Sequence, residues 1–470
     1  MRKRTVGAIG IAVAAIMTAG GLTPATADDL VTLNGYRAPG TPAQYNKVQV
    51  LKQGPAAAGH VLVLVPGTSA GAANFRPMAR ALLQRLDGDW QVWSIERREN
   101  LLEDHSVLKR YRAGQATSEQ LVDYYLGWLT NPGLTPRFQP KTTDETTFAR
   151  DWGLKVAVKD IRRVVTKASA GGRTVVLGGH SLGGRITTAY ATWNFAGKPG
   201  VRDLSGLVFI DGGGSSRELP TAAEARADLA ELDAGSPWSD LLGLGLPWVT
   251  GIFNVLGSTT AVTEPDRPSA LQPFPLVPDA LKAPVPATNL GQYGYSVDND
   301  TSPQFLALVH SHIGNLATSG EPRGWQDGEL GSARRAAQVF AEYDGYDGTS
   351  WYHPRRLSLD GSSVNNGIAN PAQKVLGVRS VFGKRIDVPL FSFDAALGGG
   401  RVADSTRALA AQSGLPRRAV TTIDRSSTFA HIDPLSAASD RNTFVMRLAP
   451  WLKRIAAVSD PDQKPVRGRG

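Results

Sequence analysis

Short apolar runs alternate with amphipathic segments along most of this chain. Runs rich in β-branched residues predict strands at 60–65, 91–95, 174–179, 204–210, 388–393 and 419–423. Segments with apolar residues at helical spacing predict helices at 75–86, 146–168, 181–195, 405–412 and 440–458. Strands that alternate with helices are typical of the α/β class. The pattern therefore predicts a doubly wound, mostly parallel sheet.

The alternation is interrupted twice. From 212 to 385 the sequence is rich in Pro, Gly, Trp and short apolar pieces, and we interpret this stretch as an inserted cap. A second interruption, 100–143, is another candidate for a segment that folds over the sheet. The predicted division is a first core part, an inserted cap or lid, a second core part and a basic tail, at 28–211, 212–385, 386–460 and 461–470.

The first 27 residues have the pattern of a secretory signal peptide. A basic start, Met1 to Arg4, precedes an apolar run from Val6 to Met17, and Ala25-Thr26-Ala27 fits the small-x-small cleavage site. The apolar run is shorter than the ~20 residues that cross a bilayer, which disfavours a membrane anchor. No later stretch is apolar enough to span a membrane. We therefore expect a secreted, extracellular protein whose mature chain starts near Asp28.

Composition narrows the possible functions. The 470 residues are 41% hydrophobic and 20% charged, which indicates a folded globular chain. The net charge of +9 is not gathered into a Lys/Arg stripe, so we expect no nucleic-acid partner. The chain has no cysteine, which excludes a thiol nucleophile, thiolate metal sites and disulfides.

One motif carries specific chemistry. Gly179-His180-Ser181-Leu182-Gly183-Gly184 matches Gly-x-Ser-x-Gly, and it lies between a predicted strand and a predicted helix. A sharp turn of this kind needs very small flanking residues and holds the serine in a strained conformation. It also places Ser181 at a helix N-terminus, where the backbone N–H of Leu182 can stabilise an oxyanion.

This segment resembles the nucleophile elbow of the α/β-hydrolase superfamily. The resemblance covers about 60–211 and 387–458, but not the predicted cap. It implies a serine hydrolase whose catalytic histidine follows the last strand, in the chain order Ser, acid, His. His431 occupies that position, in the loop Phe429 to Leu435, and an imidazole is the base that an uncharged serine hydroxyl requires.

The acid that would orient His431 is ambiguous in the sequence. Asp394 ends the predicted strand before the histidine strand, where the family usually has its acid. Asp211 ends the strand before that, a position that some members use, and Asp404 lies further along the loop after Asp394. Asp433 is too near His431 in sequence to be favoured. Each of these aspartates could equally be a helix cap or turn residue.

The loop after the first strong strand, Pro66-Gly67-Thr68-Ser69, is the place where the family donates a second N–H to the oxyanion. Thr68 is the expected donor and Ser69 the alternative. No cofactor and no metal site are expected. His310 and His312 are spaced as a pair that could bind a metal, but no nearby carboxylate pattern completes a site.

The substrate is not specified by any motif. The stretch 238–256 is dense in Trp, Leu and other apolar residues, which could line an acyl pocket or form the core of the cap, and the core interpretation is favoured. The resemblance implies a small-molecule or lipid-like carboxylic ester. Alternatives are acyl transfer to an alcohol and a peptidase, for which an acidic pocket could come from Glu96, Glu99, Glu103 and Asp104. A non-catalytic binding protein is disfavoured because both Ser181 and His431 are present.

Overall fold

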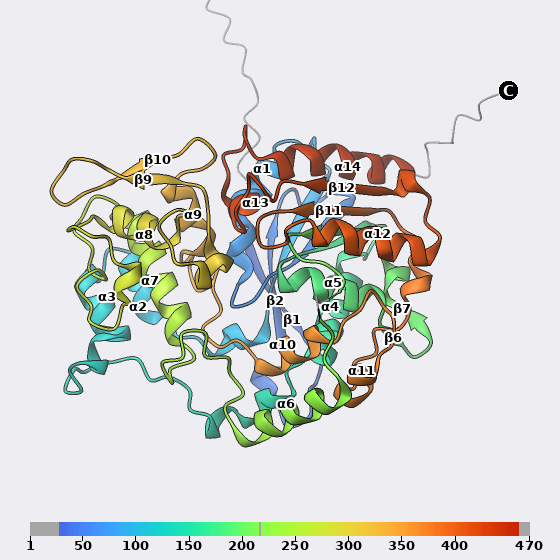
Figure 1. The fold of residues 1–470 in the computed structure, drawn as a ribbon, viewed down its shortest axis with the longest axis horizontal. Coiled ribbons are helices and arrows are strands. Elements are labelled where there is room, and N and C mark those ends of the chain that lie inside the picture. The colour runs from blue at the N-terminus through green and yellow to red at the C-terminus, as the bar shows by residue number, and fades with distance from the viewer. Residues whose placement is uncertain (1–27, 216–217, 460–470) are drawn as a thin grey trace, which may run out of the picture.

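The computed structural model describes residues 28–215 and 218–459 (Figure 1). The predicted signal peptide, 1–27, and the predicted basic tail, 461–470, lie outside these residues. Within the two described ranges, no helix combines the length and the apolar character needed to cross a bilayer.

An eight-stranded sheet forms the centre of the molecule, in the order β1-β2-β4-β3-β5-β8-β11-β12. Its strands are β1 Asp29–Asn34, β2 Lys47–Gln53, β3 His60–Val65, β4 Trp90–Glu96, β5 Thr174–His180, β8 Gly206–Ile210, β11 Leu390–Asp394 and β12 Val420–Asp424. From β4 to β12 all neighbouring strands are parallel, and at one edge β2 pairs antiparallel with both β1 and β4. The prediction of a doubly wound, mostly parallel sheet is confirmed.

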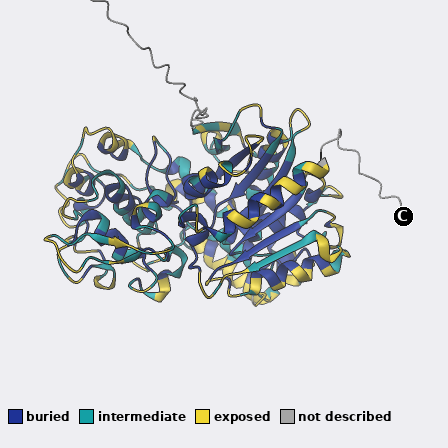
Figure 2. Cartoon of the chain, turned by 90° about the horizontal axis from the view of Figure 1, so that it is seen from above, coloured by how far each residue is buried: buried dark blue, intermediate teal, exposed yellow. Residues whose placement is uncertain are grey.

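Helices cover both faces of this sheet. One face packs against α4 Leu154–Ala168, α5 Leu182–Ala191 and α12 Arg401–Ser413, and the other against α1 Arg76–Leu83 and α14 Thr443–Ser459. Alternate residues of β3 separate into the two cores, since Val61 and Val63 face α4 while Leu62 and Leu64 face α1. Seen from above, the sheet is buried between helices whose outer surfaces are exposed (Figure 2).

The six predicted strands are present, with ends that differ by at most two residues. The helix predicted at 146–168 starts later, at Leu154, because 144–151 forms a 3₁₀ helix that is kinked at Thr146. Strands β1 and β2 were not predicted. They are the antiparallel edge of the sheet, and β1 is only partly buried, so it lacks the continuous apolar run of the central strands.

The segment between β8 and β11 does not fold as one piece. Its helices are α6 Ala222–Ala234, α7 Val249–Thr263, α8 Asn289–Val297, α9 Ala333–Phe340, α10 Arg355–Ser362 and α11 Pro371–Leu376. Helix α10 packs against the sheet helices α4 and α5, and α6 packs against both α10 and α11. Helices α7, α8 and α9 instead join α2 Ser106–Arg112 and α3 Ser118–Tyr125 on the other side of Figure 1. We call this second group, with its hairpin of β9 Gly314–Leu316 and β10 Trp325–Asp327, the side lobe.

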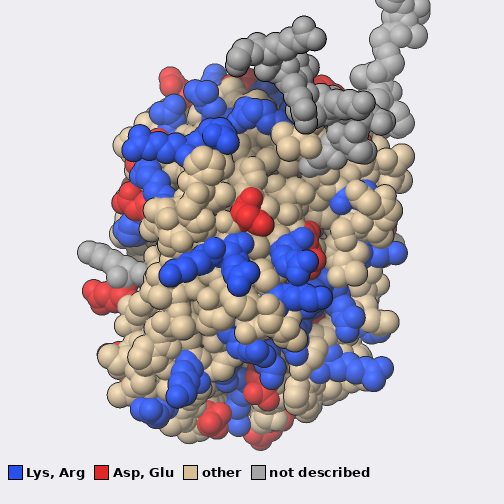
Figure 3. Space-filling model, turned by 90° about the vertical axis from the view of Figure 1, so that its right-hand side faces the viewer, with Lys and Arg blue, Asp and Glu red and all other residues tan. Residues whose placement is uncertain are grey.

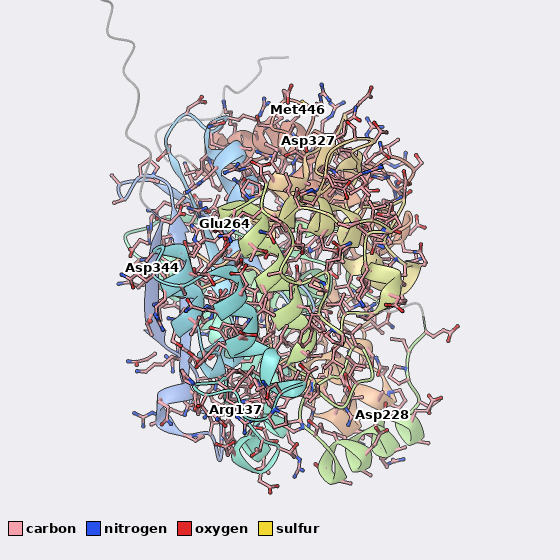
Figure 4. All side chains as sticks on the ribbon, turned by 90° about the vertical axis from the view of Figure 1, so that its left-hand side faces the viewer. Arg137, Asp228, Glu264, Asp327, Asp344 and Met446 are labelled. Carbon is pink, nitrogen blue, oxygen red and sulfur yellow. The ribbon has the colours of Figure 1, made fainter. Side chains whose placement is uncertain are left out.

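The side lobe has an apolar core of its own. Trp248, Ile252 and Leu256 on or next to α7 are buried in it, together with aromatic residues from the segments of α2, α3 and residues 351–352. The core interpretation of the stretch 238–256 is therefore correct for these residues. At the surface, Glu264 at the end of α7 accepts a hydrogen bond from the Tyr111 hydroxyl of α2 (2.7 Å), and Figure 4 shows Glu264 on the same face as Arg137 and Asp344.

Basic side chains outnumber acidic ones on the face seen in Figure 3, in agreement with the net charge of +9. On that face they lie in small groups separated by neutral surface.

Candidate active site

Ser181 lies at the sharp turn between β5 and α5, in the backbone conformation that the motif predicts. Its φ of 55° and ψ of −125° are rare for a residue with a side chain, and such strain costs of order 1–3 kcal/mol. The turn is held by two hydrogen bonds: the Ser181 N–H donates to the Ile210 carbonyl (2.9 Å), and the Gly184 N–H donates to the Ser181 carbonyl (3.0 Å). The strained serine is thus fixed between two neighbouring strands and the first turn of α5.

Glycines surround this turn because backbone segments meet there. A Cβ on Gly179 would lie 2.1 Å from the Gly183 carbonyl oxygen, and a Cβ on Gly183 would lie 2.0 Å from the Val65 carbonyl oxygen. A Cβ on Gly67 would lie 2.9 Å from the Ser181 Cβ, so the loop after β3 also touches the serine. No residue with a side chain fits at these positions without displacing the backbone.

His431 is held by an aspartate at the end of a neighbouring strand. Its Nδ1 lies 2.5 Å from Oδ2 of Asp211, and both side chains are buried. The other oxygen of Asp211, Oδ1, accepts hydrogen bonds from the backbone N–H groups of Ala395 (2.7 Å) and Gly398 (2.8 Å). His431 and Ser181 line the same cavity. The structure thus brings together the predicted serine, the predicted histidine and one of the three candidate acids.

The charge state of this pair follows from its hydrogen bonds. Burial by itself would raise the pKa of Asp211, but the hydrogen bond and positive potential of His431, with the Ala395 N–H, outweigh it and lower the pKa. The carboxyl is therefore ionised at neutral pH and can only accept. Nδ1 of His431 must then carry a proton, and in the neutral imidazole Nε2 is the hydrogen-bond acceptor.

Asp394, the first choice for the acid, has a different partner. Its Oδ1 accepts from the Val402 N–H (2.9 Å) and its Oδ2 from the Ala403 N–H (2.8 Å), so it caps the first turn of α12. The expectation that Asp394 contacts His431 is wrong because both oxygens point into this helix instead. Asp404, the third candidate, is exposed and pairs with Arg407 (3.0 Å).

His180 supports the histidine loop from within the elbow. Its Nε2 lies 3.0 Å from the His431 carbonyl oxygen, and the two imidazole rings have centroids 4.3 Å apart. Burial, together with repulsion from His431 when that imidazole is protonated, lowers the pKa of His180 to about 3, so His180 is neutral at pH 7. Because a carbonyl only accepts, the proton of His180 is on Nε2. His180 therefore packs beside the turn and also fixes the His431 backbone.

The loop after β3 is anchored by an arginine that sequence reasoning did not identify. Arg97, directly after β4, donates through Nη1 to the carbonyls of Pro66 (2.9 Å) and Gly67 (3.0 Å). Its Nε donates to Glu99 (2.5 Å), and both side chains are buried. Arg97 thus fixes the segment that precedes Thr68. The only sequence signal was its position at the end of a central parallel strand, where site residues gather.

Ser69, the alternative oxyanion donor, is engaged elsewhere. Its N–H donates to Nδ1 of His353 (3.3 Å), and its carbonyl accepts from the Ser350 N–H (2.9 Å). Burial and the charge of Arg97 lower the pKa of His353 to about 3, which keeps this imidazole neutral and able to accept. Thr68 lines both cavities that contain Ser181, whereas Ser69 lines only one. The geometry favours Thr68 over Ser69.

The acidic residues after β4 do not open into the cavities beside Ser181. Glu96 accepts from the Ala72 N–H (2.6 Å), and Glu103 accepts from the Trp351 N–H (2.7 Å). Glu99 pairs with Arg97, and Asp104 accepts from the Tyr124 hydroxyl (2.6 Å). These carboxyls connect loops to one another, so they do not form the acidic pocket that an aminopeptidase would need there.

Glu103, His105 and Asp347 place one potential ligand atom each within 4.8 Å of one another, the closest approach to a metal-binding group among the described residues. His105 Nε2 already lies 3.2 Å from Glu103, and Asp347 accepts from the Thr349 N–H (2.6 Å). Burial and the charge of Glu103 raise the pKa of Asp347 to about 8. These three side chains are held by hydrogen bonds within the chain. None of them lines a cavity that contains Ser181.

The two histidines of the side lobe, His310 and His312, are used in structural contacts. His312 donates its backbone N–H to Oδ1 of Asp433 (2.9 Å), and its Nδ1 lies 2.7 Å from Oδ2. The Ala430 N–H also donates to Asp433 (2.6 Å), and the Ile432 N–H donates to the His310 carbonyl (3.0 Å). The hydrogen bond to Asp433 raises the pKa of His312. Asp433 therefore links the His431 loop to the side lobe. Its position two residues after His431 in the sequence does not predict this contact.

Two cavities contain Ser181, and a third adjoins one of them. The base cavity, about 240 Å³, contains Ser181 and His431. The arginine cavity, about 370 Å³, contains Ser181 with Arg185 and Arg401. The apolar cavity lies in the side lobe and shares its wall with the base cavity through Leu241, Thr250, Asn254, Leu308 and Val309. Leu242 and Phe253 line the apolar cavity, so part of the stretch 238–256 does form a pocket.

The sheet, with a strained serine at the β5–α5 turn and a histidine after the last strand, is the α/β-hydrolase fold. No model of a protein family matches the sequence. The comparison with curated proteins likewise gives no match.

Solved structures with a similar arrangement include three proteins of low sequence identity. A protein assigned as a lipase from Sulfolobus solfataricus is 15% identical, with a TM-score of 0.46 and coverage of 90% of this chain and 93% of the other. An esterase from Thermogutta terrifontis is 11% identical, with a TM-score of 0.38 and coverage of 91% and 99%. An epoxide hydrolase from an endophytic Streptomyces is 14% identical, with a TM-score of 0.40 and coverage of 92% and 97%.

Proposed function

We propose that this protein is a serine hydrolase that cleaves a carboxylic ester through an acyl-enzyme intermediate. Ser181 is the nucleophile, His431 the general base and Asp211 the acid that orients it. The observation that carries the proposal is the 2.5 Å contact between Asp211 and Nδ1 of His431, in the same cavity as a serine with φ of 55°. A buried aspartate held against a histidine at this place is difficult to explain by stability alone, since burying the charge of Asp211 costs free energy.

The first chemical step is attack of the Ser181 oxygen on the ester carbonyl. Nε2 of His431 takes the hydroxyl proton, and the ionised Asp211 stabilises the imidazolium that results. The C–O bond to the alcohol then breaks, and His431 returns the proton to the departing alcohol oxygen. Water next attacks the acyl-enzyme with His431 again as base, which releases the acid and restores Ser181.

Two backbone N–H groups are assigned to the negative oxygen of the tetrahedral intermediates. Leu182 is the first residue of α5, so its N–H has no acceptor within the helix. Thr68 follows Gly67, whose carbonyl is held by Arg97, and it lines both cavities that contain Ser181. Loss of one such donor typically lowers turnover by about 10²–10³. Arg97 acts as a positioning residue for this loop.

The test begins with Ser181→Ala. Wild-type protein should be labelled by a fluorophosphonate and should hydrolyse para-nitrophenyl esters of short acids. Ser181→Ala should lose labelling and fall by about four to six orders of magnitude in turnover, while its unfolding curve stays close to that of the wild type. Ser427→Ala, at an exposed serine, is the matched control and should behave as wild type. Retained activity in Ser181→Ala would overturn the proposal.

A second assay separates the reactions that this site could perform. Para-nitroanilides of amino acids test a peptidase, and added short alcohols test acyl transfer through ester products in place of the free acid. The engaged carboxyls of Glu96, Glu99, Glu103 and Asp104 favour ester hydrolysis over an aminopeptidase. Faster cleavage of anilides than of esters would reverse this preference.

Secretion is also part of the proposal. It rests on the sequence of residues 1–27, with its basic start, apolar run and Ala25-Thr26-Ala27. N-terminal sequencing of protein from the culture medium should give a chain that begins near Asp28. A protein retained in the cell with Met1 intact would contradict it.

A further inference from the structure

Two arginines from separate helices line one cavity beside the nucleophile. Arg185 lies on α5, four residues after Ser181, and Arg401 is the first residue of α12. Both line the arginine cavity together with Ser181. Neither the elbow motif nor the Asp211–His431 pair requires a cation at these positions, so the proposed reaction leaves them unexplained.

Neither arginine of this cavity forms an ion pair with an acidic side chain of the described residues. Among residues 28–215 and 218–459, no ion pair or hydrogen bond to the Arg185 side chain is found. Burial lowers the pKa of Arg185, and the nearby charge of Arg401 lowers it further. Asp211 is the one acidic residue among the described residues that line the cavity, and both of its oxygens are taken by His431, Ala395 and Gly398. Arg401 donates only to a carbonyl, that of Leu397 (2.5 Å).

The rest of the wall is suited to an anion. Ser215, Ser358 and Ser405 also line the cavity, and the Ser405 hydroxyl donates to Oδ1 of Asn366 (3.1 Å). The hydroxyl of Ser358 lies 2.8 Å from Nε2 of His353. Because the Ser69 N–H donates to Nδ1 of His353, the proton of that imidazole is on Nε2 and the Ser358 oxygen accepts it. The Ser358 hydroxyl proton is then free to point into the cavity.

The other cavity that contains Ser181 has another character. The base cavity shares the apolar residues Leu241, Leu308 and Val309 with the apolar cavity of the side lobe. A scissile carbonyl at Ser181 would thus adjoin apolar residues in one cavity and two guanidinium groups in the other. Guanidinium groups bind carboxylates and phosphates through paired, charge-assisted hydrogen bonds.

We propose that Arg185 and Arg401 form a subsite for an anionic group of the substrate, a carboxylate or a phosphate. The substrate class is then an ester with an apolar chain on one side of the scissile carbonyl and an anionic group on the other. This inference rests on the proposed function, because it takes Ser181 as the reacting residue. It adds the chemical nature of the two substrate halves.

The experiment compares esters that differ only in charge. Para-hexanoyloxybenzoate and its methyl ester place the anion on the alcohol side, and para-hexanoyloxyphenyl phosphate replaces the carboxylate by a phosphate. The mono-para-nitrophenyl ester of adipate, compared with para-nitrophenyl hexanoate, places the anion on the acyl side. In wild-type enzyme we expect a higher kcat/KM for the anionic member of at least one pair.

Arg185→Gln should lower the anionic-to-neutral ratio of kcat/KM by about tenfold or more, mainly through KM. Arg185→Lys should keep part of the preference, and Arg401→Gln should lower it as well. Arg407→Gln is the matched control, since Arg407 is also on α12 but pairs with Asp404 outside the cavity, and it should leave the ratio unchanged. A wild-type preference for the neutral ester, or an unchanged ratio in both glutamine variants, would overturn the subsite.

A binding measurement keeps this result separate from the reaction. Calorimetry with Ser181→Ala should show tighter binding of para-hexanoyloxybenzoate than of its methyl ester, and the added Arg185→Gln change should remove the difference. If wild type cleaves none of the esters yet this binding difference is present, the proposed function fails and the subsite stands. If the esters are cleaved without any such difference, the subsite fails and the proposed function stands.

Discussion

Two neighbouring strands of the sheet, β8 and β11, both end in a buried aspartate, and the two residues have different tasks. Asp211 follows β8 with a φ of 45° and directs one oxygen at His431. Asp394 is the last residue of β11, and both of its oxygens accept from the start of α12. Residue type, burial and position at a strand end are shared. The difference is the backbone conformation at Asp211, which turns its side chain across to the histidine loop.

The two turns are also physically linked. Gly398, in the loop after β11, donates its N–H to Asp211, and a Cβ at this position would lie 2.3 Å from Oδ1 of Asp211 and 3.0 Å from Oδ1 of Asp394. The β11 loop therefore supplies the backbone that supports the aspartate of β8. Strand β11 ends at the position where the acid was expected, but its loop supplies N–H groups that support Asp211. The neighbouring strand β8 supplies the carboxylate that contacts His431.

The largest effect is expected for Asp211→Asn, which should lower turnover about 10⁴-fold. The amide oxygen would take the place of Oδ1, where the Ala395 and Gly398 N–H groups donate, and the NH₂ would then face His431. Nδ1 would have to accept, so the proton would move to Nε2, where it blocks proton transfer from Ser181. Turnover of the para-nitrophenyl esters measures this. A loss of less than about tenfold would assign the acid elsewhere.

An intermediate effect is expected for Gly398→Ala. The added methyl group would push the Asp211 carboxylate away from its position, and a displacement near 1 Å can cost about a hundredfold in kcat. We expect a loss of about 10- to 100-fold in kcat with a folded protein, checked by circular dichroism. The matched control is Gly324→Ala in the hairpin of the side lobe, where a Cβ meets nothing within 4 Å. Equal losses in both variants would show that the contact with Asp211 is not the cause.

A smaller effect on activity is expected for Asp394→Asn. One of the two N–H groups of α12, at Val402 or Ala403, would face an NH₂ instead of an oxygen, at a cost of about 1–3 kcal/mol in the free energy of unfolding. Urea unfolding measures this cost. Turnover should stay within a few-fold of the wild type, since no catalytic group loses a partner. A large loss of turnover with unchanged stability would reverse the roles of Asp394 and Asp211.

The smallest effect concerns the pH dependence of stability. The folded state lowers the pKa of Asp211 below its ordinary 3.8, so the stability that the ionised carboxyl adds is present above that value. It is lost as the pH falls through the folded-state pKa. The gap in unfolding free energy between wild type and Asp211→Asn should therefore narrow toward acid. Asp404→Asn, at an exposed aspartate, controls for net charge. A gap that widens in acid would contradict this.

The sequence predicted those features that depend on local pattern. The central strands are continuous apolar runs because both of their faces are buried, and the elbow is specified by glycines whose Cβ atoms would collide with the backbone. Ser181 and His431 could be proposed as site residues from motif and chain order. The structure adds the partner of His431, since it brings Asp211 within 2.5 Å of Nδ1.

The remaining features depend on contacts between distant segments. Nothing near Asp211 or Asp394 in sequence reveals that one turns toward His431 and the other toward α12. Arg97 is 30 residues away from the Gly67 carbonyl that it holds, and Asp433 is 121 residues away from His312. Such pairs become visible only when the sheet order is known. The sequence also did not predict that α2 and α3 belong to the side lobe, because the helices that they join follow them by more than a hundred residues.

The bond between Asp433 and His312 has a consequence for how this protein can diversify. Asp433 and Ile432 anchor the His431 loop to residues 310–312 of the side lobe, so the lobe cannot be exchanged without affecting this loop. Replacing the side lobe on this core would change both the apolar cavity and the contacts that support the His431 loop. New substrate ranges are therefore more accessible through single changes in the apolar cavity, at Leu242 or Phe253, than through exchange of the whole lobe.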